Sequence, residues 1–306
     1  MAFNLIILSD TRILPDRDFR EIAKRVRARA RDIHAFVATE RGGRSTAQWA
    51  QLLRPTLFVE IQPVAGLRRW RGTLAAPQEG ARGKMAAYRL LEAAGLPVPA
   101  WREIVPGIKL DPAEWGAWVV VKPDLGLRGI NVEAVRTEEL RYRSPEELPA
   151  DHLGRTGPML VQRFVPTPDG PSYYRVMTCF GVPLLATYLY TAPSGAPPRL
   201  QSRDGPPKVT LAYPPARLAD EADILDLARR VHATLPQVPT LGCDFLRDRD
   251  TGQLWISEVN KSNVWQFSSP RGIRFQSRLG LDLYGQFGAL DRAAEAMIAA
   301  TRRFAR

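Results

Sequence analysis

Two neighbouring strand-like segments near the end of the chain constrain the fold more than any other feature. They have the sequences TLGCDFLRD and QLWISEVN, with a DTG turn signal at residues 250–252 between them. This signal suits a three-residue hairpin loop whose glycine takes the left-handed conformation. Arg249 then pairs with Gln253, and counting back along both strands places Asp244 opposite Glu258. The sequence therefore predicts a sheet in which two acids face each other.

A third oxygen donor belongs to the same patch. Asn260 follows Glu258 by two residues, and residues i and i+2 of a strand share a face. Mg²⁺ prefers hard oxygen ligands and completes its octahedron with waters and phosphate oxygens. Without a cation, two opposed carboxylates would repel. The set Asp244, Glu258 and Asn260 therefore predicts a metal site, and the alternative is that the acids are solvated at strand ends.

Residues 1–80 alternate between strand and helix patterns. Strand-like FNLIILSD, IHAFVAT and TLFVEIQP are separated by helical patterns at 16–31 and 45–55. Such alternation favours a small parallel sheet with helices packed on it. No glycine-rich fingerprint follows the first strand, so a dinucleotide site is not indicated.

Residues 81–306 contain longer strand patterns with helices at both ends. A helix begins near Lys84 and ends at Gly95, and further helices are predicted over 219–235 and 286–304. A Pro- and Gly-rich segment, 192–208, predicts a surface loop. Between these elements we expect five strands, with the sequences AWVVVKP, GINVEAVR, MLVQRFVP, SYYRVMTCFG and PLLATYLYT.

Lysines and glycines of this region predict a phosphate grip. Lys122 follows a buried strand and precedes a loop in which Gly126 and Gly129 let backbone amides approach an anion. A strand follows this loop, which indicates a hairpin flap rather than a Walker-type loop. Lys84, at the start of its helix, supplies a second point charge. The alternative for either lysine is a solvated strand or helix end.

Arg175 lies inside the strand pattern SYYRVMTCF. Burying an arginine is costly unless it meets an anion, and its planar fork suits a phosphate or an acyl intermediate. The alternative is an arginine on an edge strand that faces water. The histidines His34, His152 and His232 lie far apart without metal-ligand spacing, so we expect them to be structural or on the surface.

The chain has a net charge of +11 and a pI of about 10.1. Residues 1–83 carry 15 Lys and Arg against 8 Asp and Glu, a net +7, much of it on the amphipathic helix at 16–31. We interpret this as a solvated face, with an acidic macromolecule as the alternative. The sequence contains no transmembrane or secretory pattern. Cys179 and Cys243 suit buried thiols, which favours a cytoplasmic location.

Five segments resemble the ATP-grasp superfamily, nearest its glutathione synthetase-like and ribosomal-protein glutamate ligase-like branch of carboxylate–amine ligases. The resemblance covers about residues 81–265. Its most specific part is Asp244 followed fourteen residues later by E-x-N. The segments, in family order, are GKMAAYRLLEAAGLPVPA, VVVKPDLGLRGINV, MLVQRFVP, YYRVMTCFG and CDFLRDRDTGQLWISEVN.

The resemblance implies an α/β protein with two α+β lobes: an ATP-grasp domain at 81–306, preceded by a small parallel-sheet domain at 1–80. ATP would lie between the lobes, with an adenine linker near 160–166. Mg²⁺, with Mn²⁺ as the alternative, would be held by the residues that match Asp244, Glu258 and Asn260. Lys84 and Lys122 match the phosphate lysines, Arg175 matches the arginine that steadies the transferred phosphoryl, and the linker residues are Gln162, Arg163, Phe164 and Val165.

The sequence departs from the family pattern around the substrate. Arg163 replaces a common acid, Tyr174 precedes Arg175 where the ligases carry an acid two positions earlier, and KSNVWQFSS follows Asn260 without the usual Pro-Gly. Loop 192–208 lacks the family's Arg/Asn/Gly pattern, and its candidate substitutes are Arg199, Arg203 and Lys208.

The leading hypothesis is therefore a ligase that uses Mg-ATP to join a small carboxylate to an amine through an acyl phosphate, on an amino acid or small peptide. Two alternatives remain: an ATP-gated binding module for an acidic partner such as nucleic acid, and an ATP-grasp phosphotransferase. No membrane partner is expected, and a homodimer is left open.

Overall fold

In the computed structural model the described residues are 1–39, 53–64, 72–77, 83–126, 129–169, 171–190, 215–262 and 264–306. Most of the helix predicted at 45–55 and the whole loop at 192–208 lie outside them. The same is true of the three candidate substitutes in that loop, Arg199, Arg203 and Lys208.

The N-terminal part forms the predicted small parallel sheet. β1 lies between β2 and β3, and β4 follows β3, with all three pairings parallel. The apolar side of the amphipathic helix α1, Arg17–Arg29, is buried through Phe19, Ile22 and Val26. The strand bounds are β1 Phe3–Ser9, β2 Ile33–Thr39, β3 Thr56–Glu60 and β4 Thr73–Ala75.

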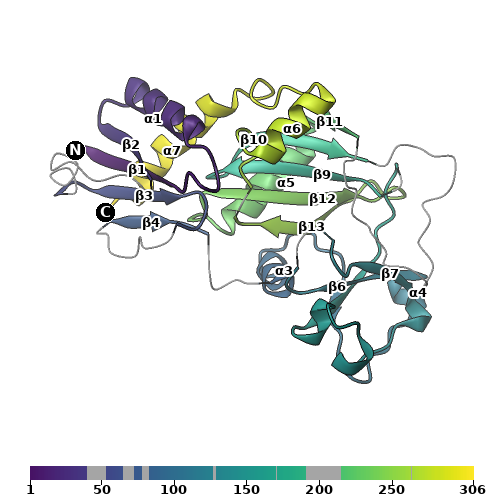
Figure 1. Cartoon of the computed structure of the whole chain (residues 1–306). Helices are drawn as coiled ribbons and strands as arrows, with labels where there is room; N and C mark the ends of the chain where they lie inside the picture. Colours follow the sequence, from purple (N-terminus) through teal and green to yellow (C-terminus); the bar gives the residue numbers. More distant parts are fainter. Residues whose placement is uncertain are drawn as a thin grey trace.

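A five-stranded sheet forms the middle of the molecule (Figure 1). Its strands are antiparallel to their neighbours. Helix α5, Ala222–Ala233, packs on one face through Ile224, Leu227 and Val231. In order across the sheet, the strands are β11 Ala216–Leu218, β10 Val182–Leu189, β9 Tyr173–Cys179, β12 Thr240–Arg247 and β13 Leu254–Asn260.

A four-stranded antiparallel sheet forms a separate lobe, drawn at the lower right of Figure 1. Helix α3, Lys84–Ala93, precedes it in the chain and packs against β13 of the five-stranded sheet. The short helix α4, Pro112–Trp115, contacts the lobe's own strand β6. The order is β5 Trp101–Glu103, β8 Met159–Arg163, β6 Trp118–Pro123 and β7 Glu133–Arg136.

The last helix joins the N-terminal sheet to the five-stranded sheet. Helix α7, Ala289–Phe304, packs beside α1 and contacts β1, β3, β9 and β10. One apolar cluster contains Ile22 of α1, Leu57 of β3, Leu185 of β10 and Met297 of α7. The first residues of the chain and the last therefore share one core (Figure 1).

Several elements were not predicted. The strands β4, β5 and β11 have only three residues each, too few for a hydrophobic period to be visible. Helix α6, Pro270–Leu279, was missed although it is amphipathic; it buries only Gly272, and its Phe275 packs partly buried against the core. Its start does carry a signal, because Ser269 caps the helix by accepting a hydrogen bond from the Gly272 N–H.

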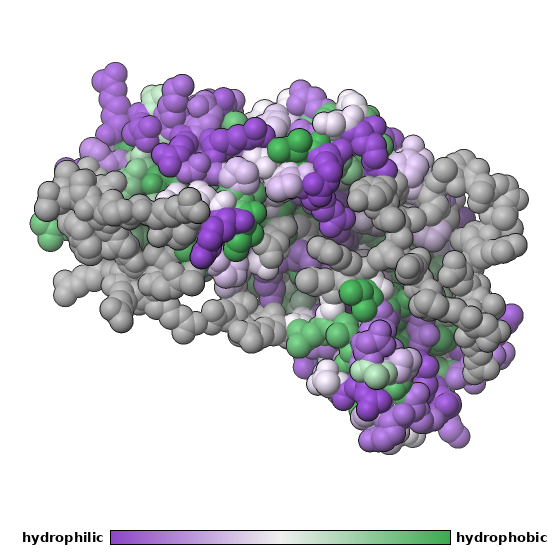
Figure 2. All heavy atoms as spheres, viewed as in Figure 1, coloured by the Kyte–Doolittle hydropathy of each residue, from purple (hydrophilic) through white to green (hydrophobic). Residues whose placement is uncertain are grey.

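The basic helix α1 has acidic partners within the chain. Arg20 pairs with Asp16, while Arg25 and Arg29 both pair with Asp291 of α7. Figure 2 shows the hydrophilic surface that gathers over this helix. Part of the positive charge of residues 1–83 is therefore compensated locally. Within the described ranges, no helix is long and apolar enough to span a membrane.

Buried thiols and one buried histidine follow their expected structural roles. Cys179 and Cys243 are buried free cysteines, and burial raises the pKa of Cys179 to about 12. His232 lies 2.7 Å from the Thr178 hydroxyl through Nδ1, and burial lowers its pKa to about 4. These groups are therefore neutral parts of the core.

Candidate functional site

The β12–β13 hairpin contains the predicted pair of acids, but its loop and its strand register differ from the prediction. Asp244 pairs with Glu258, which confirms that part of the register. The loop is one residue longer than predicted. The Asp248 N–H donates to the Gln253 carbonyl, so Asp248 takes the place that was predicted for Arg249 opposite Gln253. A bulge between Asp244 and Phe245 then shifts the register back by one. Ser257 is the extra residue.

Arg175 meets the acid of the adjacent strand. Its Nε and Nη2 each donate to one oxygen of Asp244, both at 2.7 Å. The attraction of this carboxylate raises the pKa of Arg175, opposed by burial. Strand β9 lies between β10 and β12, so the edge-strand alternative is wrong. The buried anion expected for this arginine is, in the free protein, a protein carboxylate.

Glu258 meets the first lysine of the phosphate grip. Its Oε1 lies 3.6 Å from the Lys84 Nζ, and that Nζ also donates to the Gly126 carbonyl at 3.1 Å. A line of neighbouring charges therefore runs from Arg175 through Asp244 and Glu258 to Lys84, across three strands and onto the start of α3.

Asp124 fixes the start of α3 against the flap. Its carbonyl accepts from the Lys84 N–H at 3.2 Å, and its Oδ1 accepts from the Met85 N–H at 2.8 Å. These bonds satisfy two of the free N–H groups of the helix. A Cβ on Gly83 would lie 2.0 Å from an Asp124 oxygen, and Gly83 has φ +96°. Only glycine suits this close approach.

Lys122 is buried with two acceptors. Its Nζ donates to the Tyr88 hydroxyl and to the Gln162 Oε1, each at 2.7 Å. Burial lowers the pKa of Lys122 to about 7, with Glu258 raising it and Lys84 lowering it. Ligand phosphates would favour the protonated form. Lys122 is thus embedded in the lobe interior rather than solvated at a strand end.

The predicted linker residues have different surroundings. Gln162 is 3% exposed, and its Nε2 has no hydrogen-bond partner among the described residues. The Arg163 guanidinium lies 5.4 Å from the centroid of the Trp255 ring, in cation–π geometry. Phe164 is partly buried and Val165 is buried. Arg163 therefore touches β13 of the five-stranded sheet from the end of β8.

The flap glycines have local structural reasons for their identity. Gly129 has φ +70°, in the left-handed region. A Cβ on Gly126 would lie 2.8 Å from the Pro123 ring, so close packing requires glycine there. Gly129 therefore meets a backbone requirement and Gly126 a packing requirement, and the Gly126 carbonyl accepts from Lys84.

The oxygen donors fit a hard divalent cation. Asn260 pairs with Gly242, two residues along from the Asp244–Glu258 pair, so the two carboxylates and the amide share one patch. No group of three His, Cys, Asp or Glu side chains suited to a metal occurs in the described part of the chain. The set supplies three oxygen donors, and Mg²⁺ completes its octahedron with further oxygen ligands such as waters. A carboxylate bound by Arg175 keeps lone pairs for a metal.

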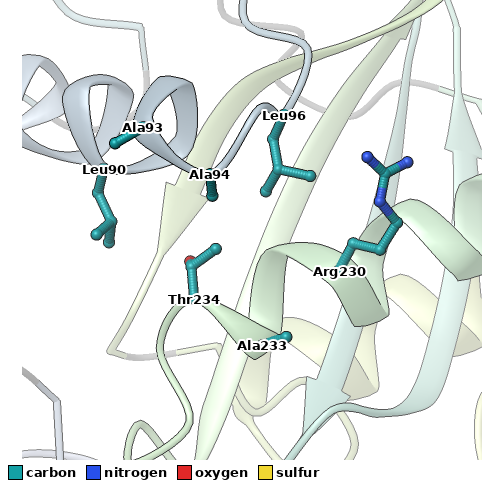
Figure 3. Close-up of a pocket in the computed structure, with 7 residues that line it drawn as sticks. All are labelled: Leu90, Ala93, Ala94, Leu96, Arg230, Ala233 and Thr234. Carbon is teal, nitrogen blue, oxygen red and sulfur yellow. The ribbon is translucent and has the colours of Figure 1, made fainter.

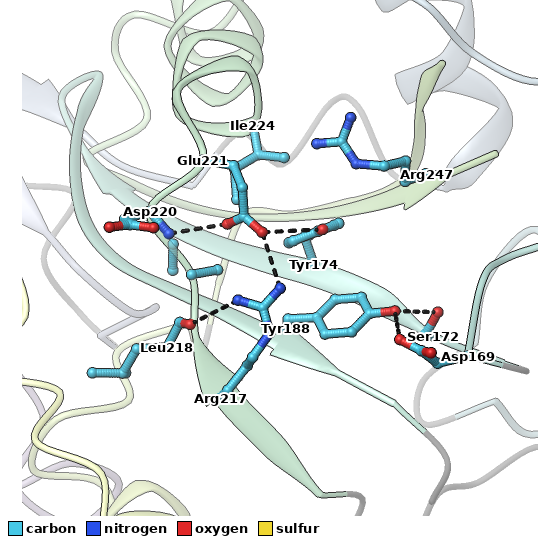
Figure 4. A network of polar contacts seen from close by, with 12 residues as sticks. Asp169, Ser172, Tyr174, Tyr188, Arg217, Leu218, Asp220, Glu221, Ile224 and Arg247 are labelled. Carbon is cyan, nitrogen blue, oxygen red and sulfur yellow. Dashed lines mark hydrogen bonds and ion pairs between the residues drawn. The ribbon is translucent and has the colours of Figure 1, made fainter. Parts of the chain in front are cut away.

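The opposite face of the five-stranded sheet carries a separate polar network (Figure 4). The Tyr174 hydroxyl donates to Glu221 at 3.2 Å, and Arg217 donates to the same carboxylate at 3.1 Å. Tyr188 donates to Asp169 at 2.6 Å. Neighbouring residues of a strand point to opposite faces, so Tyr174 is directed away from the Arg175 side.

A surface hollow of about 530 Å³ lies between the end of α3 and α5 (Figure 3). Its lining includes Leu90, Leu96, Arg230 and Thr234, and none of the candidate site residues. It contains no carboxylate for a metal. The hollow is therefore distinct from the charged site.

The sequence did not indicate that Tyr88 and Asp124 belong to the site. Tyr88 was not named as a site residue, although it follows Lys84 by one helical turn and therefore shares its face. Asp124, directly after Lys122-Pro123, was not singled out. An aspartate can cap a helix when it lies next to the start of that helix in space. Asp124 is far from α3 in the sequence, so this contact could not be seen there.

The two lobes, with the small parallel sheet that precedes them, are similar in fold to ATP-grasp ligases of known structure. D-cycloserine synthetase DcsG is similar over 97% of this chain and 99% of its own, with a TM-score of 0.54 and 18% identity. ATP-grasp ligase PsnB, complexed with minimal precursor, Mg and ADP, is similar over 98% of both chains, with a TM-score of 0.54 and 16% identity. No family model and no curated protein matches the sequence.

These comparisons confirm the predicted fold class: two α+β lobes preceded by a small parallel sheet. At such low identity these comparisons show the fold alone, because one fold can carry many different functions.

Proposed function

We propose that the protein is a Mg-ATP-dependent ligase that joins a carboxylate to an amine. The observation that supports this most is the line of charges from Arg175 through Asp244 and Glu258 to Lys84. Each acid has a cationic neighbour in the free protein. The phosphates of ATP would attract Arg175 and Lys84, and a metal ion would attract Asp244 and Glu258. These side chains could therefore exchange their present partners for the ligands when the ligands bind.

The residues divide the work of phosphoryl transfer. Lys84 and Lys122 would neutralise phosphate oxygens, and Arg175 would face the transferred phosphoryl group. Asp244, Glu258 and Asn260 would hold Mg²⁺, which would offset the negative charge of the phosphates. Positioning and charge neutralisation are the main requirements of this reaction, and no covalent protein group is needed.

The reaction itself has two steps. A substrate carboxylate oxygen attacks the γ-phosphorus, the bond to the β-phosphate oxygen breaks, and ADP leaves. The amine then attacks the carbonyl carbon of the acyl phosphate, inorganic phosphate leaves, and the nitrogen loses a proton. PsnB is described as bound to a precursor peptide in one solved complex. An amino acid or a peptide is accordingly the substrate class that we propose for this chain.

A screen for phosphate release tests the proposal. We expect Mg²⁺-dependent release of ADP and phosphate when the enzyme receives ATP with pooled amino acids and short peptides, and an amide product by mass spectrometry. Glu258→Gln should lower kcat/KM by about 100-fold, since it weakens the charge that holds the metal. The control is Glu147→Gln, an exposed acid paired with Arg141, which should retain activity.

Two outcomes would refute the ligase. Full activity in Glu258→Gln would show that the carboxylate has no part in the reaction. A phosphorylated product with no amide, from the same substrate pools, would instead identify a phosphotransferase.

A further inference from the structure

The hydroxyl of Tyr88 lies where three elements meet. Tyr88 is on α3 and is 1% exposed. Its oxygen is 2.5 Å from the Ser257 carbonyl of β13 and 2.7 Å from the Lys122 Nζ of β6. The Lys122 Nζ also lies 5.2 Å from the centroid of the Tyr88 ring. One side chain therefore touches the strand of the candidate metal ligands and the buried lysine of the other lobe.

The direction of each proton in this cluster follows from chemistry. The Ser257 carbonyl can only accept, so the single Tyr88 hydroxyl proton points to it. An ammonium can only donate, so the Tyr88 oxygen accepts from Lys122. For the same reason Gln162 must offer Lys122 its Oε1, which leaves the amide nitrogen without a partner among the described residues.

This arrangement leaves one N–H of Lys122. The ammonium has three donors, and Tyr88 and Gln162 take two of them. With two directions fixed by buried acceptors, the tetrahedral geometry at Nζ fixes the third. A lysine side chain that is not held in this way loses rotamer entropy when it binds a ligand. Holding it beforehand reduces that cost.

The bulge at Ser257 connects Tyr88 to the strand that carries Glu258. It places the Ser257 carbonyl opposite Tyr88, one residue before Glu258. Any shift of the strand that moves Glu258 would therefore also move the acceptor of the Tyr88 hydroxyl. This couples the orientation of Lys122 to the strand that carries the acid.

We propose that Tyr88 is a positioning residue that aims the third N–H of Lys122 at the phosphates of ATP and ties Lys122 to the metal-ligand strand. The inference rests on the proposed function only for the identity of the anion. The competing interpretation is that Tyr88 is a core residue whose hydroxyl merely satisfies a buried carbonyl.

A double-mutant cycle separates these interpretations. The affinity for Mg-AMPPNP is measured by calorimetry in the wild type, Tyr88→Phe, Lys122→Met and the double variant. We expect Tyr88→Phe to weaken binding about tenfold, the effect of one hydrogen bond to a charged group. In the Lys122→Met background the same change should alter affinity less than twofold, because the group through which Tyr88 acts is absent.

Two further variants keep the test decisive. Tyr174→Phe removes a hydroxyl that contacts Glu221 on the other face, and it should leave affinity unchanged. Gln162→Leu removes the second acceptor of Lys122 together with an unpartnered buried donor, so we expect it to fold even if Tyr88→Phe is unstable. Its loss of affinity should likewise vanish in the Lys122→Met background.

The outcomes distinguish this inference from the proposed function. Equal losses with and without Lys122 would overturn the positioning role while leaving nucleotide binding intact. Wild-type protein that does not bind Mg-AMPPNP would overturn the proposed function itself, and the role of Tyr88 with it.

Discussion

The charge state of Lys122 depends on its burial and on its charged neighbours. Burial lowers its pKa to about 7, against 10.5 for a free lysine, and only partial compensation comes from Glu258. Near neutral pH the free protein therefore holds a mixture of ammonium and amine. An anionic ligand at Nζ favours the ammonium and raises the pKa again.

Binding of Mg-ATP should consequently take up a proton. The sign follows from the pKa: below about 6 the lysine is already protonated, and above 7 binding must add the proton, so affinity falls as pH rises from 7 to 9. Calorimetry at pH 8 in buffers of different ionisation enthalpy measures the uptake. Lys122→Met should bind without this component, and unchanged uptake in that variant would place the titrating group elsewhere.

Sequence reasoning at the residue level found the charges but not their partners. The residues Asp244 and Glu258 were placed opposite each other by a loop one residue too short, and the bulge at Ser257 compensated for that error. A bulge depends on what packs against it, here the Tyr88 hydroxyl, which is 169 residues away in the chain. Local sequence could not contain that contact.

Helix α3 is the element that joins the phosphate lysine to the flap. Its first turn rests on Asp124, and a glycine precedes it because a Cβ would meet that carboxylate at 2.0 Å. Its other end has Gly95, with φ +67° and no atom within 4 Å of an added Cβ. The two glycines share a positive φ and differ in the space around them.

This difference gives a matched pair of variants. Gly95→Ala should cost about 1–2 kcal/mol of unfolding free energy, the strain of a positive φ alone. Gly83→Ala should cost more and also weaken Mg-ATP binding, because Asp124 must move away from the start of the helix that carries Lys84. Urea unfolding and nucleotide titration measure both effects. Equal behaviour of the two variants would mean that the contact with Asp124 does not matter.

Among the strands of the described residues, the sequence patterns predicted those with four or more residues. The strands β1, β9, β10 and β12 have seven or eight residues, enough to show their burial pattern. The three-residue strands exist because a neighbouring strand offers hydrogen bonds, as β8 does for β5. That cause lies in the tertiary structure, so no local signal indicates it.

At the scale of the whole molecule, the domain boundary near residue 80 stays a prediction. The packing of α7 bears on whether residues 1–80 could form a domain by themselves. Helix α7 buries Ala293, Met297 and Ala300 in the cluster that also contains Phe19 and Ile22 of α1. The N-terminal sheet thus receives part of its core from the far end of the chain. A fragment without that helix would expose apolar surface that the full chain buries.

We therefore expect residues 1–80 to be unable to fold alone. The fragment should lack a cooperative thermal transition by circular dichroism, and adding a peptide of residues 286–306 should increase its helicity and its protection from hydrogen exchange. The same peptide with Met297→Asp is the control, since Met297 is fully buried and a charge there would have no partner. A cooperative transition of the fragment without any peptide would show instead that the N-terminal sheet is an independent domain, and that α7 is attached to a core already complete.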